Sequence, residues 1–121
     1  MGTFHAEVTL LDLTEQRRLT LDALVDTGAT YVTVPASQLS ALGIEPTERR
    51  TFVLADGRRA EYDIGFAMVS LDCRRAPTLV VFGDEGSAPL LGAVALESLG
   101  LAVDPVARRL IPVAGYLLLL Q

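Results

Sequence analysis

One short segment of the chain combines an acid, a hydroxyl and a glycine in an arrangement suited to catalysis. An apolar stretch ending at Val25 leads directly into Asp26-Thr27-Gly28, and the β-branched stretch 31–34 follows. Asp, Thr and Gly favour turns over regular strand pairing, so this segment is predicted to be a loop that presents the Asp26 carboxylate. A bare Asp-Thr-Gly also arises by chance in roughly a few per cent of chains of this length, and a plain turn is the alternative.

A second segment, 65 residues downstream, has a related design. Pro89-Leu90-Leu91-Gly92 is an apolar stretch that ends in a glycine, and the apolar stretch 93–99 that follows it is predicted to be a short helix. Each of the two segments is therefore an apolar strand that gives way to a glycine-containing turn.

The elements that must position these segments are short strands joined by turns. The pattern predicts strands at 3–13, 18–25, 31–34, 51–54, 59–71, 78–82, 101–103 and 109–113, and short helices at 36–42 and 93–99. Asp56-Gly57 is a strong hairpin signal, and Gly43 and Gly100 are suited to end the helices in the left-handed conformation. The predicted fold is mainly β, a small closed β-barrel with one or two short helices, as a single domain over 1–121.

The composition indicates which partners to expect. Half of the 121 residues are hydrophobic and the mean hydropathy is +0.40, which is high for a small domain and favours association with another chain. The net charge is −5 and no basic stripe is present, so no nucleic-acid partner is expected. All ten basic residues are arginines in five adjacent pairs, which we expect to be solvated at turns and edges.

Single cysteine and histidine residues limit other chemistry. Cys73 is the only cysteine and His5 the only histidine, so neither a disulfide, a cysteine nucleophile with a histidine partner nor a metal site is expected, and no cofactor. The start of the chain lacks the features of a signal peptide, and the apolar run 117–120 is far shorter than a membrane span. We therefore expect no membrane partner and a cytoplasmic location.

Together these segments resemble the retropepsin-like aspartic peptidases, in particular their single-domain cellular and prokaryotic members. The resemblance runs from about residue 3 to residue 113. It includes Val-Asp-Thr-Gly-Ala-Thr at 25–30, Leu-Gly-Ile after the first helix, Ala-Asp-Gly at 55–57, and the Leu-Leu-Gly, Leu-Glu-Ser-Leu-Gly-Leu and Asp-Pro segments near the end. It implies a retropepsin-type barrel, an aspartic endopeptidase acting on extended peptides, and a homodimer.

The resemblance also implies a mechanism that needs two carboxylates. Two acids about 3 Å apart repel by about 5 kcal/mol when both are charged, so one keeps its proton. The charged one then activates a water and the protonated one hydrogen-bonds the scissile carbonyl. Other aspartates lack the hydroxyl or glycine context, among them Asp12, Asp22, Asp56, Asp63, Asp72 and Asp84. The second acid is therefore expected to be Asp26 of another copy.

Further roles follow from the same resemblance. Thr27 is expected to hydrogen-bond across the dimer axis, and Gly28 to let a peptide approach the acids. Ala29 lacks the hydroxyl that pepsin-like enzymes carry there, so a less acidic pH optimum than that of pepsin is expected. Segment 51–62 is expected to be a flap over the substrate. The predicted substrate-binding residues are Leu24, Ala29, Thr30, Ala55, Asp56, Gly57, Leu90 and Leu91, with core packing as the alternative for the leucines.

Two departures from the family leave other functions open. Ala93 stands where retroviral enzymes usually carry an arginine, and the flap has Asp56, Arg58 and Arg59 instead of a glycine-rich tip. These features favour a non-catalytic dimeric peptide-binding module on the same fold, whereas the intact Asp-Thr-Gly favours a peptidase. An unrelated small barrel with a chance Asp-Thr-Gly is the third hypothesis.

Overall fold

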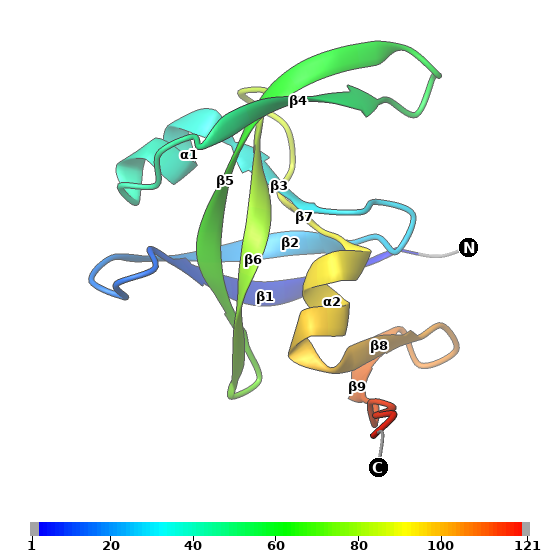
Figure 1. Cartoon of the computed structure of the whole chain (residues 1–121). Helices are drawn as coiled ribbons and strands as arrows, with labels where there is room; N and C mark the ends of the chain where they lie inside the picture. Colours follow the sequence, from blue (N-terminus) through cyan, green and yellow to red (C-terminus); the bar gives the residue numbers. More distant parts are fainter. Residues whose placement is uncertain (1–2, 120–121) are drawn as a thin grey trace.

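The computed structural model describes residues 3–119, which form nine strands and two short helices (Figure 1). In chain order the elements are β1 (Phe4–Leu11), β2 (Arg18–Val25), β3 (Val32–Pro35), α1 (Ala36–Ala41), β4 (Glu48–Val53), β5 (Arg59–Leu71), β6 (Arg74–Gly83), β7 (Leu90–Leu91), α2 (Ala93–Leu99), β8 (Leu101–Asp104) and β9 (Arg109–Pro112). The predicted fold class, mainly β with two short helices, is confirmed.

Seven of these strands form one sheet that closes on itself. The strand order is β1-β2-β7-β3-β6-β5-β4, and an additional pairing of β1 with β5 closes the ring. β4 pairs with β5 beyond the point of closure, so the β4–β5 hairpin projects past the ring at the top of Figure 1. β8 and β9 form a separate two-stranded sheet. The predicted closed barrel is thus present, with one hairpin left outside it.

Alternating burial along the strands explains why the ring closes around an apolar core. β2 turns Leu21, Ala23 and Val25 inward and leaves the residues between them more exposed. Successive side chains of a strand point to opposite faces, so one face of each strand fills the interior. Leu10, Leu39, Ile64, Leu91, Val34, Val69 and Val80 are the largest fully buried side chains. Each such burial contributes about 1.5–3 kcal/mol to stability.

The two-residue strand β7 is inserted between β2 and β3. It runs parallel to β2, with Leu90 opposite Leu24, and antiparallel to β3, with Leu90 opposite Thr33. β3 in turn lies parallel to β6, from Val32 opposite Val80 onward. The two segments with predicted chemistry therefore meet at the same place in the sheet, although 65 residues separate them.

One arginine corrects the expectation that all five arginine pairs are solvated. Arg74 is partly buried, and its Nη1 donates to the carbonyl oxygens of Leu99 (2.9 Å) and Gly100 (3.2 Å). These are carbonyls at the C-terminal end of α2, where a helix lacks partners of its own and a cation is favourable. Gly100 has φ = 70°, the predicted left-handed end of this helix. Arg74 thus fastens α2 to the hairpin β5–β6.

Some boundaries differ from those predicted. The connection between the strands predicted at 59–71 and 78–82 consists of two residues, Asp72 (φ 49°) and Cys73 (φ 65°), and β6 begins at Arg74, four residues before the predicted start. A two-residue hairpin loop with two positive φ angles matches the twist of the flanking strands, which explains the tight connection. β4 begins at Glu48, three residues before the predicted start, and Pro35 ends β3 as well as preceding α1.

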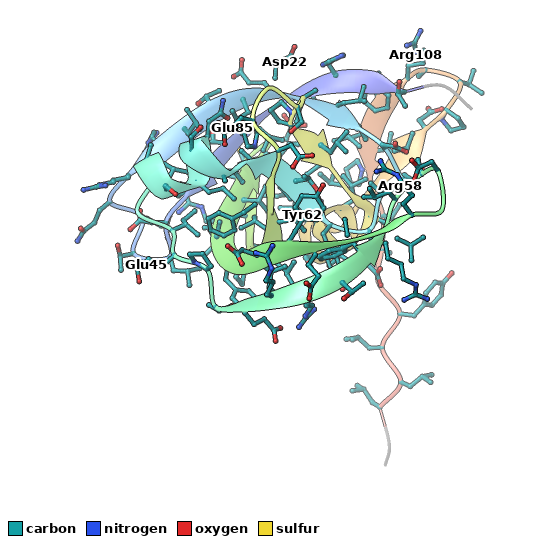
Figure 2. All side chains as sticks on the ribbon, turned by 90° about the horizontal axis from the view of Figure 1, so that it is seen from above. Asp22, Glu45, Arg58, Tyr62, Glu85 and Arg108 are labelled. Atoms are coloured by element: carbon teal, nitrogen blue, oxygen red, sulfur yellow. The ribbon has the colours of Figure 1, made fainter. Side chains whose placement is uncertain are left out.

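The end of the chain is exposed and apolar. Tyr116, Leu117, Leu118 and Leu119 are between 78% and 100% exposed, and this segment extends away from the rest of the molecule (Figure 2). Leu120, which belongs to the same apolar run, lies outside the described residues, as do residues 1–2 and 121. Across residues 3–119 no helix has both the length and the apolar character needed to traverse a bilayer.

Candidate active site

The loop that follows β2 presents the Asp26 side chain. The Oδ1 atom of Asp26 accepts a hydrogen bond from the N–H of Gly28 (2.9 Å), and its backbone carbonyl accepts one from the N–H of Ala29 (3.1 Å). The chain therefore turns tightly around the carboxyl group, as predicted for Asp-Thr-Gly. A methyl group at Gly28 would lie 3.1 Å from Oδ1, so glycine at this position leaves room beside the acid.

Backbone hydrogen bonds from β7 and α2 hold the Asp26 loop in place. The N–H of Asp26 donates to the carbonyl of Leu91 (3.1 Å), which extends the pairing of β2 with β7. The N–H of Ala93 donates to the carbonyl of Ala29 (2.9 Å), and the N–H of Val94 to that of Thr30 (3.0 Å). The first N–H groups of a helix have no partner within it, and α2 has no side-chain cap, so the loop carbonyls fill that role.

Gly92 makes this contact possible. A side chain at Gly92 would lie 2.8 Å from backbone atoms of Thr30 and Tyr31, closer than real Cβ contacts. Glycine is therefore required where β7 passes into α2, because the backbone of the Asp26 loop occupies the space of a side chain. This is the structural reason for the Leu-Leu-Gly segment.

The hairpin of β4 and β5 is the predicted flap. Its tip is closed by hydrogen bonds from the N–H of Leu54 to the carbonyl of Arg58 (2.7 Å) and from the N–H of Gly57 to the carbonyl of Leu54 (2.9 Å). Asp56 accepts the N–H (3.0 Å) and Nε (2.6 Å) of Arg58. The backbone N–H and then the guanidinium of Arg58 hold the pKa of Asp56 below its usual value. Figure 1 shows the tip pointing to the same side as the loop between β2 and β3.

A groove of about 460 Å³ lies between the flap and the Asp26 loop. Its lining combines the loop after β2, the flap, the end of β6 and the start of β7. The lining residues are Asp26, Gly28, Ala29, Thr30, Tyr31, Thr33, Phe52, Val53, Leu54, Ala55, Tyr62, Val81, Gly83, Asp84, Ser87 and Leu90. The groove is mainly apolar, and Asp26 and Asp84 contribute its carboxylates.

The structure brings six of the predicted site residues together in this groove: Asp26, Gly28, Ala29, Thr30, Ala55 and Leu90. The others do not line it. Thr27 is exposed, Asp56 and Gly57 lie at the flap tip, Leu24 is partly buried in β2, and Leu91 is fully buried in the core. For Leu91 the geometry matches the packing alternative.

Aromatic rings connect the flap to the floor of the groove. Phe52 of the flap lies edge-on to Tyr31, with ring centroids 6.2 Å apart, and 6.3 Å from Tyr62. The hydroxyl of Tyr62 donates to Oδ2 of Asp84 (3.1 Å). This hydrogen bond, followed by burial and the negative charge of Asp84, raises the pKa of Tyr62, while the Arg58 guanidinium acts in the opposite direction.

The loop after β6 is fixed to α1. Glu85 accepts the N–H (2.9 Å) and the hydroxyl (2.5 Å) of Ser37, and these bonds lower the pKa of Glu85. The hydroxyl of Ser87 donates to the carbonyl of Asp84 (2.6 Å), so the loop also carries its own turn. Asp84 is thereby placed at the rim of the groove.

Sequence reasoning missed the groove wall formed by β3, β6 and the loop after β6. The residues concerned are Tyr31, Thr33, Val81, Gly83, Asp84 and Ser87. They meet because β3 and β6 pair in parallel, and pairing between distant strands leaves no local signal. The available signal was the acidic pair Asp84-Glu85, which stands just before the Leu-Leu-Gly segment. In the part of the chain from 3 to 119, no three His, Cys, Asp or Glu side chains are grouped to hold a metal ion.

Solved structures with the same arrangement of strands define the class of fold. The chain is similar to the protease of equine infectious anaemia virus in complex with an inhibitor (TM-score 0.54, 20% identity, 82% of this chain and 89% of that one). It is also similar to the simian foamy virus protease (0.52, 17%, 76% and 92%) and to a Legionella pneumophila protein of unknown function (0.53, 20%, 85% and 92%). The fold is that of the retropepsin-like aspartic proteases.

The sequence places the chain in a family within that class. The family described as gag-polyprotein putative aspartyl protease matches residues 15–98, more than half of the chain and the whole span from β2 to the end of the Leu-Leu-Gly segment. The chain belongs to this family of aspartic proteases. Among curated proteins, no sequence matches it significantly.

Proposed function

We propose that two copies of this chain form an aspartic endopeptidase in which each copy supplies one Asp26 carboxylate. The observation that carries the proposal is the placement of Asp26: its side chain lines the groove opposite the flap, and its backbone is hydrogen-bonded to Leu91. A catalytic acid must be held in a fixed position relative to a bound peptide, and this loop has the anchoring that such a role needs.

One chain offers a single acid in this setting. The other carboxylate in the groove, Asp84, accepts the Tyr62 hydroxyl at the far end of the wall formed by β6 and lacks the hydroxyl and glycine that follow Asp26. A two-fold axis beside the Asp26 loop would bring two copies of the same carboxylate together. Thr27 is exposed in this loop and is free of the groove lining, which suits the proposed contact across such an axis.

The exposed apolar tail supports the dimer. The side chains of residues 116–119 are nearly fully exposed in the single chain, and an apolar patch of this kind is stabilised when another surface covers it. In a dimer each copy can cover the apolar tail of the other. The proposed shared active site requires the same one-to-one pairing.

In the proposed mechanism one Asp26 is ionised and the other keeps its proton. The ionised carboxylate takes a proton from water while the water oxygen attacks the scissile carbonyl carbon, and the protonated carboxyl donates its proton to the carbonyl oxygen. The tetrahedral intermediate then breaks its C–N bond: the carboxyl that took the proton from water gives it to the leaving nitrogen, and a hydroxyl of the intermediate returns its proton to the other carboxylate. The flap closes over an extended peptide, which pairs with it as an added strand.

The test measures peptide cleavage by the wild type, by an Asp26 variant, and by a mixture of the two proteins. A peptide library is incubated with the wild type and with Asp26→Asn between about pH 4 and 7, the range expected for a carboxyl pair, and light scattering records the dimer of each protein. We expect cleavage by the wild type and none by an equally dimeric Asp26→Asn. After subunit exchange, an equal mixture should retain about a quarter of the wild-type activity, because only one pairing in four unites two intact acids.

Two results would count against this proposal, the first against the shared site and the second against the peptidase activity. Retention of about half of the activity in the mixture would mean that each chain acts alone. A well-folded wild-type dimer that binds peptides without cutting any would make the non-catalytic peptide-binding module the better account of this fold.

A further inference from the structure

Asp84 lies at the rim of the groove in a position fixed by its neighbours. It follows Gly83, the last residue of β6, and a side chain at Gly83 would lie 2.8 Å from the side chain of Thr33. This close packing holds the start of the loop after β6 against β3, the strand that follows the Asp26 loop in the chain. The carbonyl of Asp84 also accepts the Ser87 hydroxyl, so the backbone on both sides of Asp84 is held.

The side chain of Asp84 is oriented as well as placed. Its Oδ2 atom accepts the Tyr62 hydroxyl at 3.1 Å, and Tyr62 packs against Phe52 of the flap. Figure 2 shows Tyr62 near the middle of the molecule in the view from above. Within residues 3–119 no hydrogen bond uses the Oδ1 atom of Asp84, and Asp84 lines the groove together with Tyr31, Phe52 and Tyr62. Asp84 is exposed, so a side chain of a bound peptide can reach its carboxylate.

No side chain of the described residues 3–119 forms an ion pair with this carboxylate. The residues that line the groove include two carboxylates and no arginine. Three of the four arginines of the β4–β5 hairpin are engaged elsewhere: Arg58 with Asp56, Arg49 with Asp63, and Arg50 with Glu48. The fourth, Arg59, is exposed and does not line the groove. None of the ion pairs formed within residues 3–119 includes Asp84. The groove therefore has a net negative charge and a free acceptor at one end.

We infer that Asp84 is a specificity-determining residue that selects peptides with a lysine or arginine side chain at the subsite beside the Tyr31, Phe52 and Tyr62 rings. The aliphatic stem of such a side chain packs on the aromatic wall, and its charged end reaches Oδ1 of Asp84. Neighbouring subsites, which Val81 and Leu90 help to line, remain apolar. This inference rests on the proposed function only in that the groove binds an extended peptide.

The experiment compares matched peptides that differ in one charge. N-acetylated, C-amidated peptides carry either lysine or its uncharged isostere norleucine at each position in turn, and acetylation removes the terminal amine as a competing cation. The wild type is assayed for kcat/KM, and Asp26→Asn for Kd, so that selectivity is measured with and without cleavage. Asp84→Asn tests the residue. Glu85→Gln is the matched control, because it removes a neighbouring charge outside the groove lining and keeps an acceptor for Ser37.

We expect one position at which lysine is preferred over norleucine by about five- to tenfold in both measurements, the effect of a partly exposed charge-assisted contact. The preference should fall below about twofold in Asp84→Asn, persist in Glu85→Gln, and weaken near 1 M salt, where screening acts over about 3 Å. Asp84→Lys should prefer glutamate at the same position. Both Asp84 variants are checked for wild-type thermal stability.

Peptides that are cleaved or bound with no lysine preference, or with a preference that survives in Asp84→Asn, would overturn the role of Asp84 and leave the proposed function intact. A folded dimer that neither cleaves nor binds any of the peptides would overturn the proposed function, and the inference with it.

Discussion

The Asp26 loop and the flap tip are built from the same local device and differ in how they are held. In each, an aspartate Oδ1 accepts the N–H of the residue two positions later: Gly28 at 2.9 Å in the loop and Arg58 at 3.0 Å in the flap. The Asp26 loop is also bonded to Leu91, Ala93 and Val94, far away in the sequence. Among the described residues, the hydrogen bonds of the flap tip all lie within its own hairpin. Tertiary hydrogen bonds, and not the turn itself, therefore decide which aspartate is fixed and which can move.

The largest expected difference between the Asp26 loop and the flap tip is the effect of a substitution on catalytic activity. Asp26→Asn should lower kcat/KM by about 10³-fold or more, because it removes a proton-transfer group from both halves of the pair. Asp56→Asn should change kcat/KM by less than about threefold, because this residue lies at the tip and outside the groove lining. Steady-state kinetics on one peptide gives both values, with circular dichroism and light scattering as controls. Equal losses in the two variants would contradict the distinction between the loops.

The next difference concerns stability. Gly92→Ala should lower the free energy of unfolding by about 3 kcal/mol, because its Cβ would lie 2.8 Å from backbone atoms that belong to a packed loop. Gly57→Ala should cost about 1 kcal/mol, because its Cβ meets open space and only the positive φ of 86° opposes it. Urea unfolding at one protein concentration compares the two. If Gly92→Ala lowered the free energy of unfolding by less than Gly57→Ala does, the backbone of the Asp26 loop would be able to move aside for a side chain at little cost.

Amide exchange should separate the two regions without mutation. The N–H groups of Asp26, Ala93 and Val94 connect distant segments, so their exchange requires the ring to open. The N–H groups of Leu54 and Gly57 can exchange when the hairpin tip alone opens. We expect protection factors at least about 100-fold higher in the first set, measured by hydrogen exchange with NMR detection. Comparable protection at Leu54 would indicate a flap that is as firmly held as the loop.

The smallest expected effect is a change in one pKa at the flap tip. The pKa of Asp56 is lowered from 3.8 by the Arg58 N–H and then by its guanidinium. Arg58→Ala should raise this pKa part of the way back, since the backbone N–H remains, as measured by carboxyl carbon shifts in NMR. A carboxyl with a lowered pKa favours the folded tip above its unfolded pKa, and this contribution is lost as the pH falls below 3.8. A pKa at or above 3.8 in the wild type would show that the Asp56–Arg58 contact is absent.

Where local chemistry decides the structure, the sequence predicted it well. The bounds of β2, β5 and α2 were predicted as observed, as were the Asp26 loop and the hairpin at Asp56-Gly57. Strand alternation, turn residues and a helix-ending glycine are all encoded within a few residues. The start of β4 was missed because almost every residue of this strand is exposed, so no inward face marks it in the sequence.

The groove wall and the role of Arg74 required the tertiary structure. Asp84 joins the site because β6 lies parallel to β3, and Arg74 was expected to be solvated although it binds the end of α2. Both depend on which strands become neighbours, and many pairings are compatible with the same local pattern. The Asp26 motif was recognisable because its loop chemistry is local, whereas the groove around it is assembled from five separate segments.

The insertion of β7 between β2 and β3 has a consequence for how a newly made chain matures. During synthesis, residues through Tyr31 emerge long before Leu91, Ala93 and Val94, whose backbone groups the Asp26 loop needs. A nascent chain with a complete flap therefore still lacks an ordered acid, and a truncated product that ends before β7 can never acquire one. Because such long-range contacts form late in folding, the Asp26 loop would become ordered only after β7 and α2 have left the ribosome.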